Sequence, residues 1–339
     1  MAKKVTMETL AHAAGVSKST VSRALKNSDE VSDKVKARIR RLAYESDYRL
    51  TGSAWEWSGK RSPTVSVVLP TSATRSELYS SPFTLEMMGV IADALADNGY
   101  NMLLTKADLS EPDAARTILS KGASDGIILI GQRGDHARIK SLARTAPNVV
   151  IWGAVLPDAD YCTIGSDNRD GGKTAAEHLI RHGRRRIAFL GDRRAIEAKL
   201  RFFGYRDAIA KSAIFFHDEL VIDTQFDRAA AMSAVGAALD DGLNIDAIFA
   251  ANDLLALSAM HALQERGANI PDDVAVIGFD DIPIAEYAMP PLTTIRQNIV
   301  EGGNTIVRSL MKIISGEGAA SKMMPAELII RQSCGAGPI

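Results

Sequence analysis

The sequence lacks most of the features that mark secreted, membrane-spanning or metal-binding proteins. Its two cysteines, Cys162 and Cys334, provide no disulfide framework. The N-terminus has no apolar signal region, and no apolar run elsewhere reaches the length needed to span a membrane. These absences predict a cytoplasmic protein with no membrane partner.

Motifs for catalysis and cofactor binding are missing as well. The six histidines show no metal-ligand spacing, no glycine-rich loop ends in Lys-Ser/Thr, and Gly191 belongs to no dinucleotide fingerprint. Asp280 and Asp281 are adjacent carboxylates, but neighbours on an extended chain point apart, and no third group is placed to act as a base or nucleophile. We therefore expect no enzyme, no metal and no cofactor.

The net charge of −1 is small, but the charges are unevenly distributed. Residues 1–62 carry 13 Lys/Arg and 7 Asp/Glu, a net +6, whereas the rest of the chain carries 27 and 34, a net −7. Because nucleic acid attracts basic surfaces, the N-terminal end is the expected DNA-binding part.

Short helices joined by a tight turn are predicted within this basic end. Thr6 can cap a first helix, Gly15 ends it, and Ser17 caps the next helix. A third helix is predicted after Ser32, with apolar residues at helical spacing over 35–42. Together they predict a three-helix, helix-turn-helix head over residues 1–50.

The second of these helices has a polar face suited to DNA. Lys18 and Ser19 lie at its start, where side chains reach base edges most directly, and a lysine can donate to guanine. Ser22 and Arg23 follow one turn later, where Arg23 could contact a base or a phosphate. The alternative for Lys18 is a plain solvated charge. Contacts to the DNA backbone are expected from Thr6, Ser17 and Lys26.

From residue 64 onward, short apolar runs alternate with amphipathic helical stretches, which predicts parallel sheets covered on both faces. The expected strands are 65–69, 101–105, 126–130, 149–152, 186–190, 247–250 and 274–279. Seven or more strands in this length fit two doubly wound subdomains better than one large sheet. We expect the chain to cross between them near 162–167 and to return near 290–297.

Several short strings follow one another in an order typical of one family. They are Gly15-Val16-Ser17, Thr20-Val21-Ser22-Arg23 and Val31-Ser32, then Gly165-Ser166-Asp167-Asn168, Ala251-Asn252-Asp253, Ile277-Gly278-Phe279-Asp280-Asp281 and Pro291-Leu292-Thr293-Thr294-Ile295. On these strings the chain resembles the lactose-repressor (LacI/GalR) family over nearly its whole length. The resemblance implies a periplasmic-binding-protein-like α/β core, a homodimer and a transcription regulator controlled by an effector.

Residues 51–62 are predicted to form a polar hinge linker. In the family the matching stretch becomes a helix on specific DNA, where paired hinge helices press a leucine into the minor groove. Here Ala54 matches the family, but Trp57 stands at the leucine position, and Leu50 and Thr51 replace the usual proline and asparagine. The Trp57 indole could insert into the groove, or it could pack on the core.

An effector site is expected between the two subdomains, because open α/β sheets bind ligands where their strands end. Asn252 and Asp280 follow strands and could accept hydrogen bonds from ligand hydroxyls, while the Arg201 guanidinium could donate. Trp152 ends a strand and could line the site. Gln297 could form the opposite wall, or it could simply bond within the crossover.

The family resemblance adds two aromatic candidates and one difference. Phe83 and Phe226 fall where the family often has an aromatic side chain facing the ligand, although aromatics usually belong to the core. Gly153 stands where many relatives carry an aspartate. The ligand contacts of the family therefore do not transfer to this chain as a set.

The sequence as a whole predicts a repressor that binds specific DNA and whose operator affinity is controlled by a small metabolite, a sugar, held in the core. A two-fold dimer would bind a roughly palindromic operator. The core is expected over 63–339, with one subdomain of about 63–163 and 293–322 and another of about 164–292 and 323–339. The alternative is a sugar-binding or chaperone-like module with a vestigial head, and an enzyme comes third.

Overall fold

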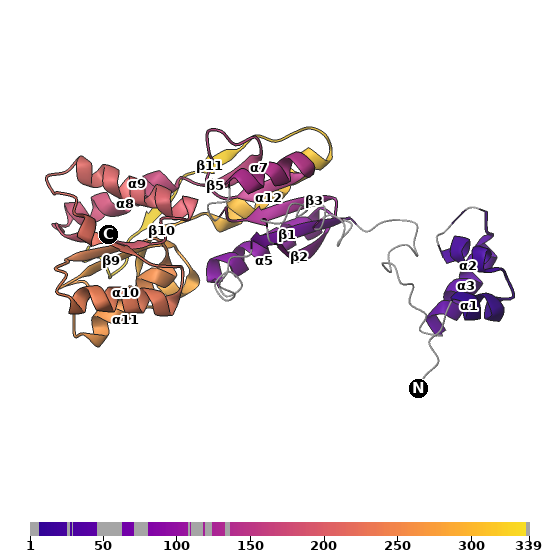
Figure 1. Cartoon of the computed structure of the whole chain (residues 1–339), viewed down its shortest axis with the longest axis horizontal. Coiled ribbons are helices and arrows are strands. Elements are labelled where there is room, and N and C mark those ends of the chain that lie inside the picture. Colours follow the sequence, from indigo (N-terminus) through magenta and orange to yellow (C-terminus); the bar gives the residue numbers. More distant parts are fainter. Residues whose placement is uncertain are drawn as a thin grey trace. The chain divides into compact units, whose positions relative to one another are not determined.

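The computed structural model describes residues 7–25, 28, 30–45, 63–70, 81–107, 109, 118, 124–132 and 136–336. The chain divides into two compact units, residues 1–63 and 64–339, both drawn in Figure 1. Among the described residues, no helix is long and apolar enough to cross a membrane.

The first unit contains the three predicted helices, α1 (Met7–Ala14), α2 (Lys18–Leu25) and α3 (Asp33–Glu45). Gly15 ends α1 in the left-handed region, at φ +60°, which a residue without a Cβ adopts at no steric cost. Ser17 caps α2, since its Oγ accepts a hydrogen bond from Thr20 N at 3.1 Å. The buried residues Val21 and Ile39 belong to the small core between the helices. The helix-turn-helix head is therefore confirmed.

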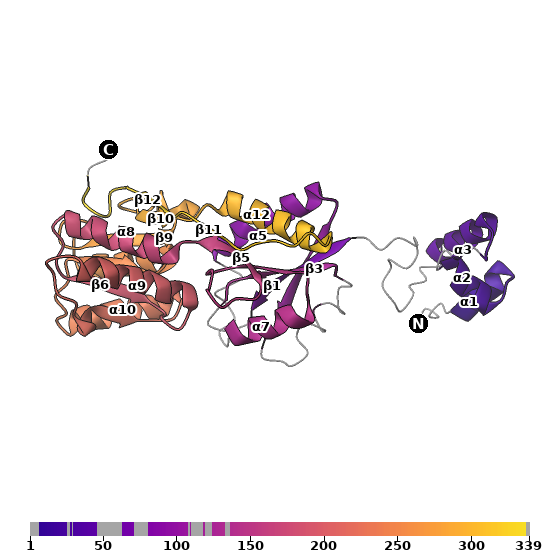
Figure 2. The ribbon, with the colours of Figure 1, turned by 90° about the horizontal axis from the view of Figure 1, so that it is seen from above.

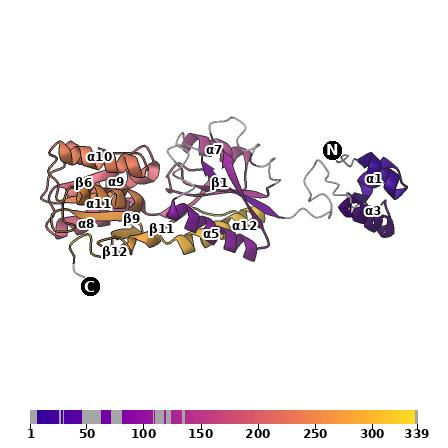
Figure 3. The same cartoon turned by 90° about the horizontal axis from the view of Figure 1, so that it is seen from below.

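The second unit begins with a parallel sheet in the order β11-β5-β4-β3-β1-β2. Its strands are β1 (Thr64–Pro70), β2 (Asn101–Ala107), β3 (Gly126–Ile130), β4 (Val149–Trp152), β5 (Cys162–Ser166) and β11 (Lys322–Met324). Figure 3 shows α5 (Pro82–Asp97) and α12 (Ile299–Ile314) on one side of β1 and α7 (His136–Thr145) on the other. Because strand side chains alternate, Ile128 and Ile130 pack towards α5 and α12, whereas Ile127 and Leu129 pack towards α7.

The second sheet has the order β12-β10-β9-β8-β6-β7, and only β12 runs antiparallel to its neighbour. Its strands are β6 (Ile187–Gly191), β7 (Val221–Asp223), β8 (Ala247–Ala250), β9 (Ala275–Asp280), β10 (Thr293–Arg296) and β12 (Glu327–Ile329). In Figure 1 its two faces are covered by α8 (Asn168–Arg181) with α9 (Ile196–Ala210), and by α10 (Arg228–Asp240) with α11 (Asp253–Glu265). Short 3-10 turns span Asp218–Leu220 and Pro283–Ala285.

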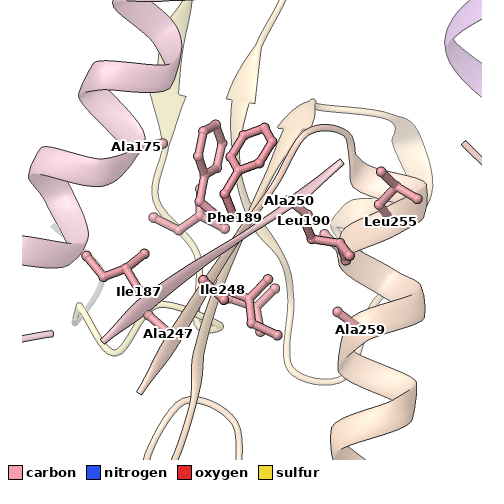
Figure 4. Packing of buried hydrophobic residues seen from close by; sticks show 14 of the residues in the cluster. Ala175, Ile187, Phe189, Leu190, Ala247, Ile248, Ala250, Leu255 and Ala259 are labelled. Carbon is pink, nitrogen blue, oxygen red and sulfur yellow. The ribbon is translucent and has the colours of Figure 1, made fainter. Parts of the chain in front are cut away.

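Aromatic side chains fill the core on the α8–α9 face of this sheet. The Phe189 ring lies edge-on to Phe202 at 5.1 Å and to Phe249 at 5.6 Å between centroids. In Figure 4, Phe189 points to the side of α8, and Leu190 points to the side of Leu255 on α11. A strand that is apolar on both faces belongs inside a doubly wound sheet.

The chain passes between the two sheets three times, after β5, after β10 and between β11 and β12. Figure 2 shows β11 of the first sheet, and α12, which packs on that sheet, beside β10 and β12 of the second. All seven expected strands are present. The chain crosses after Ser166 and after Arg296, within the expected stretches 162–167 and 290–297, but the subdomain bounds expected at about 163 and 293 lie a few residues too early, because β5 and β10 each belong entirely to one sheet. Each of these two strands pairs along its length within its own sheet before the chain crosses to the other sheet.

Candidate functional site

The polar face of α2 presents four of the nine residues predicted to contact DNA. Lys18 and Ser19 are exposed, and Ser22 is half-buried. Arg23 is exposed but paired, with 3.1 Å between its Nε and Oε2 of Glu30. A surface pair of this kind is worth about 1 kcal/mol or less, so Arg23 could exchange Glu30 for a DNA phosphate at small cost.

Ser17 uses its hydroxyl within the helix. Besides capping α2, its Oγ lies 2.8 Å from the hydroxyl oxygens of both Ser19 and Thr20. The remaining predicted DNA-binding residues, Thr6, Lys26, Ala54 and Trp57, lie outside the described residues, as does the hinge over 51–62. Their roles stay predictions.

A cavity of about 410 Å³ lies between the two sheets of the second unit. Its volume is within the range of small-molecule sites. The wall from the first subdomain is largely apolar and contains Ile130, whereas the wall from the second is rich in polar groups. All seven predicted effector residues line it: Phe83, Trp152, Arg201, Phe226, Asn252, Asp280 and Gln297.

Arg201 is the most tightly held residue of the polar wall, with only 6% of its surface exposed. Its guanidinium stacks on the Phe279 ring at 3.7 Å from the centroid, and Nε donates to Asn168 Oδ1 at 2.8 Å. Nη1 donates to the carbonyl of Ala251 and lies 3.6 Å from Asp280 Oδ1. Burial lowers the pKa of Arg201, and the Asp280 carboxylate opposes that shift.

Asp280 is directed into the cavity by an unusual backbone. Asp280 and Asp281 have φ of +120° and +58°, a region that residues with a Cβ rarely occupy. The Asp281 carboxylate is anchored at 2.7 Å by both Arg296 and Arg331. Such strain persists only where surrounding contacts hold it, and it is common at ligand sites.

Burial raises the pKa of Asp280 to about 6, although Arg201 and the hydrogen bond from Gln297 oppose the shift. The pKa of neighbouring Asp253 is raised well above its usual value by burial and by Asp280, even though its carboxylate accepts bonds from Thr294 Oγ1 and Ile282 N. The two carboxyls therefore resist being charged together.

Asp280 gives a testable pH dependence. A carboxyl with a raised pKa in the folded state stabilises the fold below the unfolded pKa of about 4, and that contribution is lost as the pH rises to about 6. As the pH rises from about 4 to about 6, we expect Asp280→Asn to become more stable relative to the natural chain. The difference between their unfolding free energies should change by up to about 3 kcal/mol. Denaturant unfolding of both proteins at several pH values measures the difference. A difference that does not change with pH would contradict the raised pKa.

Two polar residues of the cavity, Asn252 and Gln297, form hydrogen bonds within the protein. Asn252 was expected to accept bonds from a ligand, but its Oδ1 caps α11 by accepting from Leu255 N at 2.9 Å. The side-chain oxygen is therefore engaged, and the amide group is the part that can donate to a ligand. Gln297 lines the cavity, and its Nε2 donates at 2.7 Å to Oδ1 of Asp280, which ends β9.

The aromatic candidates gather at the cavity as well. The Phe83 and Trp152 rings lie 6.0 Å apart between centroids, tilted by 41°, and Phe226 is half-buried on the opposite wall. Ser166 Oγ is buried at the cavity with no hydrogen-bond partner among the described residues. A buried hydroxyl without a partner is costly unless something that binds there satisfies it.

Several lining residues were missed from the sequence. Asn168 and Asp192 come just after β5 and β6, so the rule that strand ends face the ligand would have found them. Arg194 and Glu197 lie in the loop before α9 and in its first turn, where no pattern in the sequence separates a cavity residue from a surface charge.

Two family models match the chain. The model of bacterial regulatory proteins of the lacI family covers residues 6–49, and that of the periplasmic binding protein-like domain covers residues 176–334. The HTH-type transcriptional regulator DegA of Bacillus subtilis is 31% identical over 97% of this chain and 98% of its own length. The chain belongs to the LacI family of bacterial regulatory proteins. It is a DNA-binding transcriptional regulator, like its LacI-family relatives.

The LacI-family relatives include CelR of Thermobifida fusca, also an HTH-type transcriptional regulator, which is 30% identical over 98% of each chain. A solved complex of the regulator CelR with cellobiose has 27% identity and a TM-score of 0.71, and it covers 97% of this chain and 99% of its own. A lac repressor dimer bound to operator and an anti-inducer shares the fold, with 24% identity, a TM-score of 0.73, and coverage of 98% of this chain and 100% of its own.

Proposed function

We propose that a small sugar bound in the cavity controls the affinity of the head for operator DNA, and that the protein acts as a repressor. The observation that carries this proposal is the composition of the cavity. Arg201, Asn252 and Asp280 offer hydrogen-bonding groups on one wall, and Phe83 and Trp152 offer aromatic faces on the other. A sugar has hydroxyls for the first wall and apolar C–H faces for the second. The cellobiose complex of the related regulator CelR supports this ligand class.

A ligand bound between the two subdomains contacts both of them. It therefore stabilises the relative position of the subdomains in which both walls of the cavity contact it. The change would pass through the three crossing segments to the first subdomain, whose β1 begins where the head unit ends at Pro63. Sugar and operator then alter one another's affinity by the same factor, typically about 5-fold to 150-fold.

The operator side of the proposal rests on α2. We propose a homodimer that presents two heads to a roughly palindromic operator, with α2 in the major groove and the hinge at 51–62 in the minor groove. We also propose that the protein is cytoplasmic, because a bacterial transcription regulator must bind DNA and bacterial DNA lies in the cytoplasm. We propose no catalytic role, because Asp281, the neighbour of Asp280, is committed to Arg296 and Arg331.

Lys18→Ala is expected to change the sequence preference of DNA binding. Lys18 is exposed at the start of α2, where a side chain reaches base edges. Its loss should weaken binding to the preferred operator by about 1–3 kcal/mol more than binding to mismatched sites. Lys26→Ala, predicted to remove a backbone contact, should weaken all sequences alike. Binding to an operator set, with and without single-base changes, measures both. Equal and sequence-blind losses would contradict the assignment of Lys18.

The proposed function is tested by fluorescence anisotropy of operator DNA selected with the full chain, at several salt concentrations and with a panel of sugars. We expect specific binding with a steep salt dependence, and a sugar that shifts it. Binding that no sugar changes would overturn effector control by a sugar. A chain that binds sugar but no specific DNA would be a binding module with a vestigial head.

A further inference from the structure

Glu197 joins the two walls of the cavity. It lies in the first turn of α9 in the second subdomain and lines the cavity. Its Oε1 accepts a hydrogen bond at 3.2 Å from the backbone N–H of Gln132, which follows β3 of the first subdomain. A single carboxylate therefore faces the ligand space and holds one subdomain to the other.

The donor on the opposite wall, Gln132, packs against Gly153. Gln132 is buried, and its side-chain amide exchanges two hydrogen bonds of 3.0 Å with the backbone of Ala154. A Cβ at position 153 would lie 2.8 Å from Gln132 Cδ, so a larger residue there would displace the Gln132 side chain.

The charges of the cavity are otherwise paired. Arg194 forms two hydrogen bonds with the Asp192 carboxylate, at 2.8 and 2.9 Å, and Arg201 faces Asp280. Among the described residues, Glu197 forms no salt bridge and accepts from a backbone N–H, although its charge acts on Arg201 and helps to raise the pKa of that guanidinium. The N-terminus of α9 would attract an anionic ligand group, but Glu197 already places a negative charge there.

We propose that Glu197 determines ligand specificity: it accepts a hydrogen bond from a hydroxyl or ammonium group of the sugar and rejects sugars that carry phosphate or carboxylate. A ligand that donates to Glu197 binds the residue that also links the subdomains, so recognition and closure of the cavity are coupled. This inference rests on the proposed sugar site and names the class of sugar that the site takes.

Calorimetric titration of the full chain tests this with five probes: glucose, cellobiose, glucosamine, glucose 6-phosphate and glucuronic acid. We expect at least one of the first three to bind, and the two anionic sugars to bind at least about tenfold more weakly than the best of them. Glucosamine against glucose shows whether the donor is an ammonium or a hydroxyl. Glu197→Gln should weaken binding of the best neutral or cationic probe by roughly tenfold to 100-fold. The difference in affinity between this probe and the anionic sugars should become smaller.

The matched control is Glu219→Gln, because Glu219 pairs with Arg186 just before β6, at the end of the strand away from the cavity. It should bind every probe like the natural chain. Hydrogen exchange gives a readout without ligand: the Gln132 amide should exchange about tenfold faster in Glu197→Ala. An anionic sugar that binds as well as a neutral one, or a Glu197→Gln protein that binds like the natural chain, overturns the role of Glu197. If no probe of either charge binds, the proposed sugar site itself fails, whereas an unchanged Gln132 exchange rate removes only the link between the subdomains.

Discussion

Arg201→Ala is expected to abolish the response of operator binding to sugar while leaving the operator affinity without sugar unchanged. Arg201 stacks on Phe279, bonds Asn168 and faces Asp280 in the polar wall of the cavity. Removing it takes away the main cationic donor of that wall, for which we expect roughly 100-fold weaker sugar binding. The head is a separate compact unit, so its contacts with DNA do not depend on this side chain.

The same substitution also has a cost in stability. Asp280, 8% exposed, would be left buried without its partner, which typically costs about 3 kcal/mol or more and lowers Tm by roughly 6–12 °C for a domain of this size. Anisotropy at a temperature where the variant is folded, checked by circular dichroism, separates the two effects. Arg201→Lys, which keeps the charge but not the planar fork, should fold better and still respond poorly. Loss of operator binding by a folded variant without sugar would refute the separation of roles.

Gly204→Ala is expected to destabilise the core by about 3 kcal/mol or more. A Cβ at this position of α9 would lie 1.9 Å from the carbonyl oxygen of Arg169 and 2.6 Å from the backbone nitrogen of Lys173, both in α8. Neither backbone atom can move without separating the two helices. Because Arg201 lies one turn earlier on α9 and bonds Asn168 at the start of α8, the same separation should weaken sugar binding.

Gly89→Ala is the matched control. Gly89 is exposed within α5, and a Cβ there would meet nothing within 4 Å. Alanine loses less backbone entropy in a helix than glycine, so this variant should be more stable than the natural chain by about 0.5–1 kcal/mol. Thermal and denaturant unfolding of the two variants should give changes of opposite sign. Similar effects from both would mean that the α8–α9 backbones are not in contact.

The sequence predicted the position of a site residue correctly where a single strand or helix determines that position. Asp280 was predicted at the cavity because it ends a buried strand, and Lys18 was predicted on an exposed helix start; the structure places both there. Where a second segment decides, the sequence was insufficient. The oxygen of Asn252 is engaged by the helix that follows it, and Glu197 matters because Gln132 lies opposite. Such pairs bring together residues distant in the chain, and no local periodicity encodes them.

The short strands show the same limit. β11 and β12 have three residues each, and β11 combines exposed and polar positions, so neither has the apolar run that predicts a strand. Each forms because a sheet edge is available beside it, β5 for β11 and β10 for β12. β10 contains buried threonines, Thr293 and Thr294, whose β-branched side chains suit a strand although they are polar.

The triple passage of the chain between the two sheets constrains how this protein can evolve. Neither subdomain corresponds to one continuous stretch of its gene, since each is assembled from segments separated by the other. A single crossover near residue 167 would bring the two walls of the cavity from different ancestors, but it would also place a foreign β11 beside β5 and a foreign α12 on the first sheet. New ligand preferences are therefore expected to arise by substitutions within an intact core, with each wall adapting to the other.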